Sequence, residues 1–566
     1  MTDRNALLPK EEIPAAARPL VVQSDGTLLL EVQQEWAPEA RNALCSFAQL
    51  ERSPEYIHTY RISPLSLWNA AASGVNGDWI LGALERFSRY PVPELIRHEI
   101  REQLRRFGRA TLLPWSQEYL LLRVDEPGVR LELGASDDLQ QFWVASREDG
   151  FLIRVGDRGV LKQALVRAGY PAEDLCGYAD GVPLSFALRE RCGDGRPFAL
   201  RPYQDEAVDA FHHGGGPRGG AGVIVLPCGA GKTVIGMGAM ARLQTSTLIL
   251  ATNTVAVHQW RDELLDKSDL AQEHVGEYTG DVKQVRPVTI ATYQILTHRN
   301  SRVEEFQHLD LLRQQQWGLI IYDEVHMLPA PVFRATGEIQ VRRRLGLTAT
   351  LVREDGLEGD VFALIGPKRY DMPWKILEQS GFIAEAECHE IRVDLPDELR
   401  IKYALAEKRD KFRIAAENPR KILIVEELIE NNPDDAILVI GQYLDQLEKV
   451  SADLKLSLIT GKTPNAERER LYDAFRRGHE RVLVVSKVAN FAIDLPDASM
   501  AIEISGAFGS RQEEAQRLGR ILRPKTRSAR FYAVVSRDTN EQYFAARRQI
   551  FLVEQGYRYR IMNWDF

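Results

Sequence analysis

A glycine-rich turn between a strand and a helix places the strongest constraint on how this chain can fold. The apolar run Val223–Leu226 reads as a buried strand, and the residues that follow it are Pro227, Cys228, Gly229, Ala230, Gly231, Lys232 and Thr233. Glycines at 229 and 231 let successive backbone N–H groups converge on an anion at the positive end of the next helix. Lys232 would neutralise the β and γ phosphates of a nucleotide, and the Thr233 hydroxyl would ligate Mg²⁺. These seven residues therefore predict a phosphate-binding loop, although Leu226 replaces the first glycine of the strict motif and leaves an ordinary glycine turn as the alternative.

Two adjacent acids follow a second apolar run. Trp317–Tyr322 reads as a buried strand that ends in Asp323, Glu324, Val325 and His326. A carboxylate at the tip of a parallel strand faces the phosphate loop, so that Asp323 can hold Mg²⁺ and Glu324 can orient and polarise an attacking water. The alternative is a solvated acidic turn. Together with the loop, the acids predict ATP hydrolysis.

Length, charge and cysteine usage bound the remaining possibilities. A chain of 566 residues exceeds what one core supports, so we expect three or four domains. The net charge of -8 argues against a uniformly basic surface, and any DNA footprint must be regional. A signal peptide and a long apolar span are both missing from the sequence, which favours a cytoplasmic protein without membrane contact. The cysteines are scattered, which predicts free thiols instead of a zinc or iron–sulfur site; they are Cys45, Cys176, Cys192, Cys228 and Cys388.

The N-terminal part divides into two predicted modules. Residues 1–112 show mostly helical periods, as in 81–87 and 96–107, with one extended segment near 20–32. Residues 113–195 read as a small α+β module. Its expected strands are 119–124, 129–133, 142–146 and 151–155, and its expected helix is 160–168.

Strands and helices alternate in the rest of the chain, which is typical of parallel sheets. The first lobe, 196–375, has further strand candidates at 247–251, 288–291, 319–322 and 344–347. The second lobe, 376–566, has candidates at 436–440, 481–485, 500–504 and 531–535. The predicted fold is α/β with two tandem lobes, and ATP held between them would couple hydrolysis to closure.

A basic helix in the second lobe can complete the ATP site. In the string QRLGRILR, Gln516, Arg520 and Arg523 recur at helical spacing and so share one face. Guanidinium groups on that face would meet the charge that develops on the γ-phosphoryl oxygens. A solvated basic helix is the alternative.

The set of motifs resembles that of superfamily 2 helicases, which have two RecA-like lobes, and within them the bacterial members of the XPB family. The resemblance covers about 200–560 and rests on specific strings. These are LRPYQ from Leu200, LPCGAGKT, Gln259-Trp260, LGLTATLVRED from Leu345, IGPK from Ile365, SKVANFAIDLP from Ser486 and EEAQRLGRILR.

The resemblance implies roles for individual positions. Gln204, with Arg201 nearby, would read the adenine base, and Thr348 and Thr350 would link the ATP state to the gap between the lobes. The triplet Arg353, Glu354 and Asp355 would lie near the DNA fork. The tracked strand would meet Thr292, Tyr293, Ser486 and Lys487, although Tyr293 reads equally well as a core aromatic.

Family members also carry a basic thumb that grips duplex DNA and a damage-recognition-like module. Residues 400–421 contain eight basic and three acidic residues, which suits the thumb, with an ordinary charged helix as the alternative. The module corresponds to 113–195. A task for 1–112 does not follow from the residues.

The expected function is therefore that of an ATP-dependent DNA helicase with 3′→5′ polarity in DNA repair, and a repair nuclease is a possible partner. Polarity and repair come from the resemblance, whereas ATP hydrolysis comes from the residues. One alternative is a double-strand translocase that does not unwind DNA. A damage-binding scaffold with a vestigial ATPase and an RNA substrate are less favoured.

Overall fold

The computed structural model describes most of the chain. The described residues are 13–52, 56–176, 181–215, 219–227, 229–296, 298, 308, 315–325, 328, 341, 343–349, 358–372, 386–486, 498–505, 529–554 and 559–564. Several predicted site residues lie outside them, namely Cys228, Thr350, Arg353, Glu354, Asp355, Lys487, Gln516, Arg520 and Arg523.

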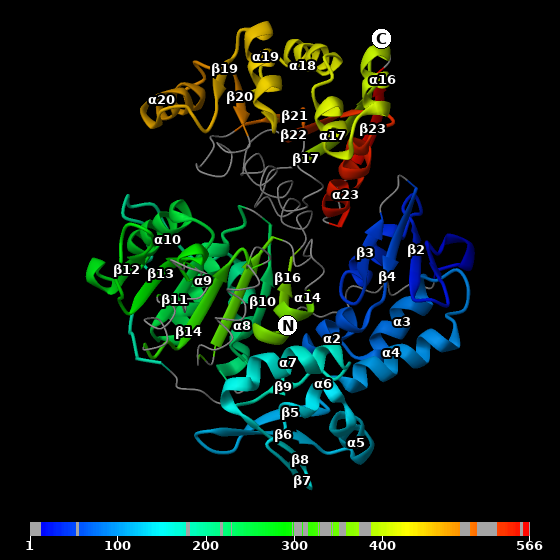
Figure 1. The fold of residues 1–566 in the computed structure, drawn as a ribbon, viewed down its shortest axis with the longest axis vertical. Coiled ribbons are helices and arrows are strands. Elements are labelled where there is room, and N and C mark those ends of the chain that lie inside the picture. Colours follow the sequence, from blue (N-terminus) through cyan, green and yellow to red (C-terminus); the bar gives the residue numbers. More distant parts are fainter. Residues whose placement is uncertain are drawn as a thin grey trace. The chain divides into compact units, whose positions relative to one another are not determined.

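The chain forms two compact units, which are described separately (Figure 1). The first consists of Met1–Gln49, Tyr60–Leu226 and Gly231–Asp371. The second consists of Leu50–Thr59, Pro227–Ala230 and Met372–Phe566.

The N-terminal region combines helices with a small sheet. A four-stranded sheet has the order β1 (Leu20–Val22), β2 (Thr27–Glu31), β4 (Ile57–Arg61) and β3 (Gln49–Arg52). The predicted single extended segment at 20–32 is thus two antiparallel strands, with Leu20 paired to Leu30, because Asp25 and Gly26 form the turn between them. The helices are α1 (Ala37–Leu44), α2 (Pro64–Ala72), α3 (Gly77–Phe87) and α4 (Glu94–Arg106). Ser63 caps α2 and Asn76 caps α3, which sets where both helices begin.

A five-stranded sheet forms the small module that follows. Its order is β7 (Ala145–Arg147), β8 (Gly150–Arg154), β6 (Tyr119–Val124), β5 (Ala110–Pro114) and β9 (Glu173–Asp174). Its helices are α5 (Pro127–Ala135), α6 (Asp137–Gln140) and α7 (Arg158–Arg167). The predicted boundary at 113 falls inside β5, so the sheet of this module begins earlier than expected.

Two strand predictions in this module were wrong. Residues 129–133 form part of α5, because Val129 and Leu133 lie four residues apart and share the buried helix face, whereas Leu131 between them is 77% exposed. Pro127 at the helix start supports the same conformation. The strand expected at 142–146 begins only at Ala145, since Phe142 and Trp143 close a turn that follows α6.

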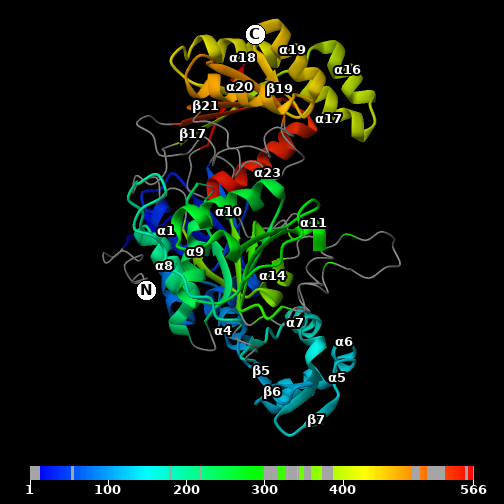
Figure 2. The same ribbon diagram turned by 90° about the vertical axis from the view of Figure 1, so that its left-hand side faces the viewer.

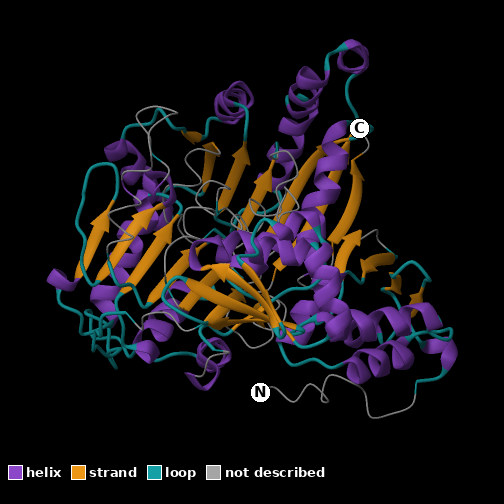
Figure 3. Ribbon diagram, turned by 60° about the horizontal axis from the view of Figure 1, so that its bottom comes forward, coloured by secondary structure: helices purple, strands orange, loops and turns teal. Residues whose placement is uncertain are grey.

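The first lobe is built on a seven-stranded sheet whose observed pairings are all parallel (Figure 3). The order is β12 (Val275–Tyr278), β13 (Val288–Thr292), β11 (Thr247–Ala251), β14 (Leu319–Asp323), β15 (Arg343–Thr348), β10 (Ala221–Val225) and β16 (Lys368–Asp371). The helices are α8 (Pro202–His212), α9 (Lys232–Leu243), α10 (Thr254–Lys267), α11 (Tyr293–Leu296) and α14 (Glu358–Leu364). The predicted strands of this lobe are confirmed, and β12 and β16 were not anticipated.

The second lobe repeats this architecture, again with parallel pairings (Figure 2). The strand order is β19 (Ser457–Ile459), β20 (Val482–Ser486), β18 (Ile437–Gly441), β21 (Met500–Glu503), β22 (Ala529–Ser536), β17 (Ala386–Val393) and β23 (Tyr559–Trp564). The helices are α16 (Asp397–Leu405), α17 (Lys408–Ala416), α18 (Arg420–Glu430), α19 (Leu444–Leu454), α20 (Asn465–Arg476) and α23 (Asn540–Glu554). Two parallel-sheet lobes confirm the predicted fold class.

Candidate nucleotide site

The phosphate loop connects β10 to α9 at the carboxyl edge of the first sheet. Gly229 and Gly231 have φ angles of +81° and +78°, a region that residues with a Cβ rarely adopt, so glycine is required at both positions. A Cβ on Gly231 would also lie 2.5 Å from the Gln204 side-chain nitrogen. The helix begins at Lys232, directly after this turn. The local sequence thus forms the curled loop and helix start that an anion-binding site needs.

Lys232 and Glu324 meet across this edge. Lys232 Nζ lies 3.1 Å from Glu324 Oε1, and the two side chains are 10% and 16% exposed. The contact follows from the strand order, because β10 and β14 both flank β15 and run parallel to it. Parallel strands present their carboxyl ends at one edge, so that residues about ninety positions apart become neighbours.

Asp323, the last residue of β14, is held by a buried tryptophan. The indole Nε1 of Trp260 donates a hydrogen bond of 2.9 Å to Asp323 Oδ2. Burial, followed by the adjacent Glu324 carboxylate, raises the pKa of Asp323 to about 6, although Trp260 and Lys232 act in the opposite direction. A carboxylate and the Thr233 hydroxyl are the hard oxygen ligands that Mg²⁺ prefers, so the donor set fits this ion.

Glu324 occupies a left-handed backbone conformation, with φ +51°. This region is costly for a residue with a side chain and is found at sites where the surrounding structure holds it. The hydroxyl of Tyr293 donates a hydrogen bond of 2.7 Å to the carbonyl oxygen of Asp323, immediately before the left-handed residue. Burial raises the pKa of Tyr293 well above its ordinary value, so the hydroxyl keeps its proton and remains a donor.

Three residues that the resemblance predicts to contact the tracked DNA strand are buried in this structure. Thr292 is 5% exposed, Tyr293 is 3% exposed and Ser486 is 2% exposed. Tyr293 belongs to the core of the first lobe, beside Tyr278 and Ile320. This is the core placement that the sequence left open as the alternative for Tyr293.

Gln204 and Arg201 lie at the start of α8. The backbone N–H of Arg201 donates to Gln204 Oε1 at 2.9 Å, and the Arg201 guanidinium donates to the Tyr203 hydroxyl at 3.2 Å. Gln204 is 4% exposed and lies against Gly231, as described above. Thr348 ends β15, and its carbonyl accepts a 2.9 Å hydrogen bond from Leu226 N. These three predicted residues therefore lie close to the phosphate loop.

The basic segment 400–421 spans α16, α17 and the first turn of α18. Its Arg400 and Lys402 are exposed, as expected of a phosphate-contacting surface. Lys421 is not: it is 1% exposed and its Nζ pairs with Glu541 at 2.7 Å. Lys421 must therefore be removed from the predicted DNA-binding set, because its charge is used inside the second lobe.

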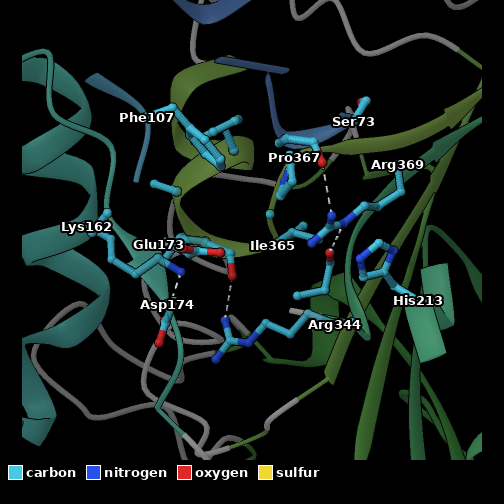
Figure 4. Close-up of a pocket in the computed structure, with 18 of the residues that line it drawn as sticks. Ser73, Phe107, Lys162, Glu173, Asp174, His213, Arg344, Ile365, Pro367 and Arg369 are labelled. Carbon is cyan, nitrogen blue, oxygen red and sulfur yellow. Dashed lines mark hydrogen bonds and ion pairs between the residues drawn. The ribbon is translucent and has the colours of Figure 1, made fainter. Parts of the chain in front are cut away.

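A large cavity lies away from the phosphate loop (Figure 4). It measures about 1410 Å³ and is lined by Ala221 and Arg344, near the amino ends of β10 and β15, and by parts of α7 and β9. Arg158 and Lys162 both bind Asp174 there, at 2.5 and 3.1 Å. The lining comes from the small module, the first lobe and the segment Ala71–Gly74, and it lies at the end of β10 opposite the nucleotide loop.

Sequence reasoning missed what Trp260 does. The residue appeared only as part of a family string, and 63 positions separate it from Asp323. The spacing of the residues around Trp260 in the sequence does not indicate that contact.

Within the described residues, every helix is too short or too polar to cross a lipid bilayer.

Three family models match the chain. They are "ERCC3/RAD25/XPB C-terminal helicase" over residues 377–565, "Type III restriction enzyme, res subunit" over 197–353 and "Helicase conserved C-terminal domain" over 20–148. The last match falls in the N-terminal region despite its description.

Curated relatives match along nearly the whole chain. "DNA 3'-5' helicase XPB" of Kineococcus radiotolerans is 53% identical and covers 97% of both chains. The protein of the same name from Mycobacterium tuberculosis is 50% identical, over 97% of this chain and 98% of its own. "General transcription and DNA repair factor IIH helicase/translocase subunit XPB/SSL2" of Saccharomyces cerevisiae is 31% identical, over 97% of this chain and 72% of its own.

Proposed function

Since this chain belongs to the XPB family of helicases, we propose that it is an ATP-dependent DNA helicase that moves 3′→5′ along one strand. The observation that carries the proposal is the Lys232–Glu324 contact beside the left-handed glycine turn. It unites a phosphate-binding cation with a carboxylate that can act on water.

The residues suggest how hydrolysis would proceed. Lys232 and Glu324 form an ion pair in which each neutralises the other. An arriving triphosphate competes for the lysine, and this frees the Glu324 carboxylate to orient the attacking water. Thr233 and Asp323 would hold Mg²⁺, which would offset the charge that develops on the phosphate oxygens. Gln204 would contact the base, and Arg520 and Arg523 would approach the γ-phosphoryl group from the second lobe.

Three further assignments remain part of the proposal. Thr350, Arg353, Glu354 and Asp355 would couple hydrolysis to the fork, and Lys487 would contact the tracked strand. The exposed basic residues of 400–421 would bind duplex phosphates. Repair is the proposed setting, because the yeast relative is named a DNA repair factor, and a repair nuclease is the proposed partner.

The test compares ATP hydrolysis with and without DNA, and then unwinding of forked duplexes. A helicase of this polarity should hydrolyse ATP faster with DNA and should unwind a fork with a 3′ tail in preference to one with a 5′ tail. Hydrolysis that is indifferent to DNA would contradict the proposal, and stimulation by RNA but not DNA would reassign the substrate.

A second candidate is a double-strand translocase. The yeast relative carries "helicase/translocase" in its name, which favours this reading. Displacement of a third strand from a triplex, without unwinding of a fork, would support it. DNA-dependent ATP hydrolysis in either assay would exclude a purely structural role as a damage-binding scaffold.

A further inference from the structure

We propose that Trp260 is a positioning residue that fixes the Asp323 carboxylate relative to the phosphate-loop helix, so that the cation ligand and the loop behave as one rigid body. The inference rests on the proposed nucleotide site and assigns a role there to a residue that does not itself touch nucleotide.

The first observation is the directed hydrogen bond. Trp260 lies on α10 and is 1% exposed, so its indole N–H has no water to bond. An indole nitrogen is a donor only, and this one donates to Asp323 Oδ2 at 2.9 Å. A charged acceptor makes such a bond stronger than a neutral one. The bond therefore restricts the rotation of the carboxylate at the end of β14.

The second observation is the absence of a side chain at Gly236. A Cβ built on Gly236 would lie 2.5 Å from Trp260 Cη2 and 3.2 Å from Cζ3. Gly236 is four residues after Lys232, one turn into the phosphate-loop helix α9. The far edge of the indole thus rests on bare backbone of the helix that carries the lysine, while the near edge binds the acid.

The third observation concerns the other side of Asp323. The Tyr293 hydroxyl holds the main-chain carbonyl of the same residue at 2.7 Å. Two buried aromatics, from α10 and α11, therefore grip Asp323 by its side chain and its backbone. The arrangement is that of an outer shell that orients a metal ligand, whose removal typically costs about 10- to 100-fold in metal affinity or activity.

The test uses Trp260→Phe, which keeps a buried aromatic ring and removes the donor. Binding of ADP to the full chain is titrated at increasing Mg²⁺, and ADP affinity is also measured with Mg²⁺ chelated. We expect the half-saturating Mg²⁺ concentration to rise about tenfold, with ADP affinity in chelator changed less than about twofold. Trp317→Phe is the matched control, since Trp317 is also 1% exposed but lies at the amino end of β14. It should leave the Mg²⁺ dependence unchanged.

Gly236→Ala provides an independent variant should Trp260→Phe fail to fold. The added methyl group must displace the indole, so the half-saturating Mg²⁺ concentration should rise in the same direction. An unchanged Mg²⁺ dependence in whichever variant folds would overturn the inference, as would an equal rise in Trp317→Phe. A wild-type chain that binds no ADP, or binds it without regard to Mg²⁺, would instead contradict the proposed function.

Discussion

Lys232 and Glu324 form an ion pair of 3.1 Å at the carboxyl edge of the first sheet. Lys232 begins helix α9 directly after the β10 loop, whereas Glu324 follows β14, which is separated from β10 by β15. Both side chains are largely buried. Each charge therefore depends on the other for compensation at this largely buried edge.

Replacement of Lys232 and replacement of Glu324 should have different effects on ATP binding. Lys232→Ala removes the cation that binds phosphate, so we expect loss of ATP binding together with at least a 100-fold fall in DNA-stimulated hydrolysis. Glu324→Gln keeps the shape of the side chain and removes the group that acts on water, so hydrolysis should fall as far while ATP binding persists. Filter binding and phosphate release measure the two effects. Equal loss of binding in both variants would contradict the separate roles.

Tyr293→Phe tests whether this residue supports the acid pair or contacts DNA. The variant removes the hydrogen bond to the Asp323 carbonyl and leaves the ring in the core. We expect the maximal rate of hydrolysis to fall about tenfold. This factor corresponds to about 1.4 kcal/mol, which is near the net contribution of one hydrogen bond. DNA affinity, measured by fluorescence anisotropy, should stay within about twofold. A fall in affinity at an unchanged rate would restore Tyr293 to the DNA-contacting set.

The buried pair between Lys421 and Glu541 should stabilise the second lobe. Lys421 Nζ donates to both oxygens of Glu541 and to the Ile504 carbonyl, and both side chains are 1% exposed. Lys421→Met leaves a buried carboxylate without its cation and should lower the free energy of unfolding by about 3 to 5 kcal/mol. Urea denaturation measures the change. Arg470→Met, which removes an exposed pair with Glu467, should leave the free energy of unfolding nearly unchanged.

The exposed cations of 400–421 should govern how salt affects DNA binding. The slope of log affinity against log salt concentration is negative. If Arg400 and Lys402 contact phosphates, replacing either by Ala makes this slope shallower by about 0.9. Lys449→Ala on α19 serves as a control, since Lys449 is exposed but lies outside the segment. Slopes that match the wild-type value in all three variants would leave 400–421 as an ordinary charged surface.

Acid should weaken the small module, in which Asp174 of β9 pairs with Arg158 and Lys162 of α7. Burial by itself would raise the pKa of Asp174, but Arg158 and Lys162 outweigh it and hold the pKa far below its ordinary value. A lowered carboxyl pKa contributes stability above the unfolded value of about 3.9 and loses it as pH falls through the folded value. Asp174→Asn should therefore lower the free energy of unfolding by about 3 to 5 kcal/mol at neutral pH.

The difference between the wild type and Asp174→Asn should narrow as pH falls below about 3.9. Urea denaturation at neutral pH and at pH values below that point measures it. Asp125→Asn is the control, because its pair with Arg123 is exposed and should contribute under about 1 kcal/mol. A difference that is the same at every pH would show that Asp174 contributes by packing alone.

Local sequence patterns predicted the strands of the lobes more accurately than the strands of the small module. Apolar runs at 247–251 and 319–322 form strands because both faces of a parallel sheet are covered. β12 was not predicted because Gly276 and Glu277 interrupt its apolar character, and the buried Glu277 carboxylate pairs with Arg261 and His258. The alternation of Val129, Leu131 and Leu133 fits a strand as well as a helix, so only the surface that they pack against decides between them.

The amino-acid sequence by itself determined the phosphate loop, since the left-handed turns at Gly229 and Gly231 and the helix start at Lys232 depend on adjacent residues. The rule that parallel strands end at one edge was enough to bring Asp323 and Glu324 to the same place. Only the tertiary structure decided that Trp260 grips Asp323, that Tyr293 lies in the core, and that Lys421 is buried against Glu541. Those contacts join residues far apart in the chain, and burial and pairing of this kind leave no trace in local spacing.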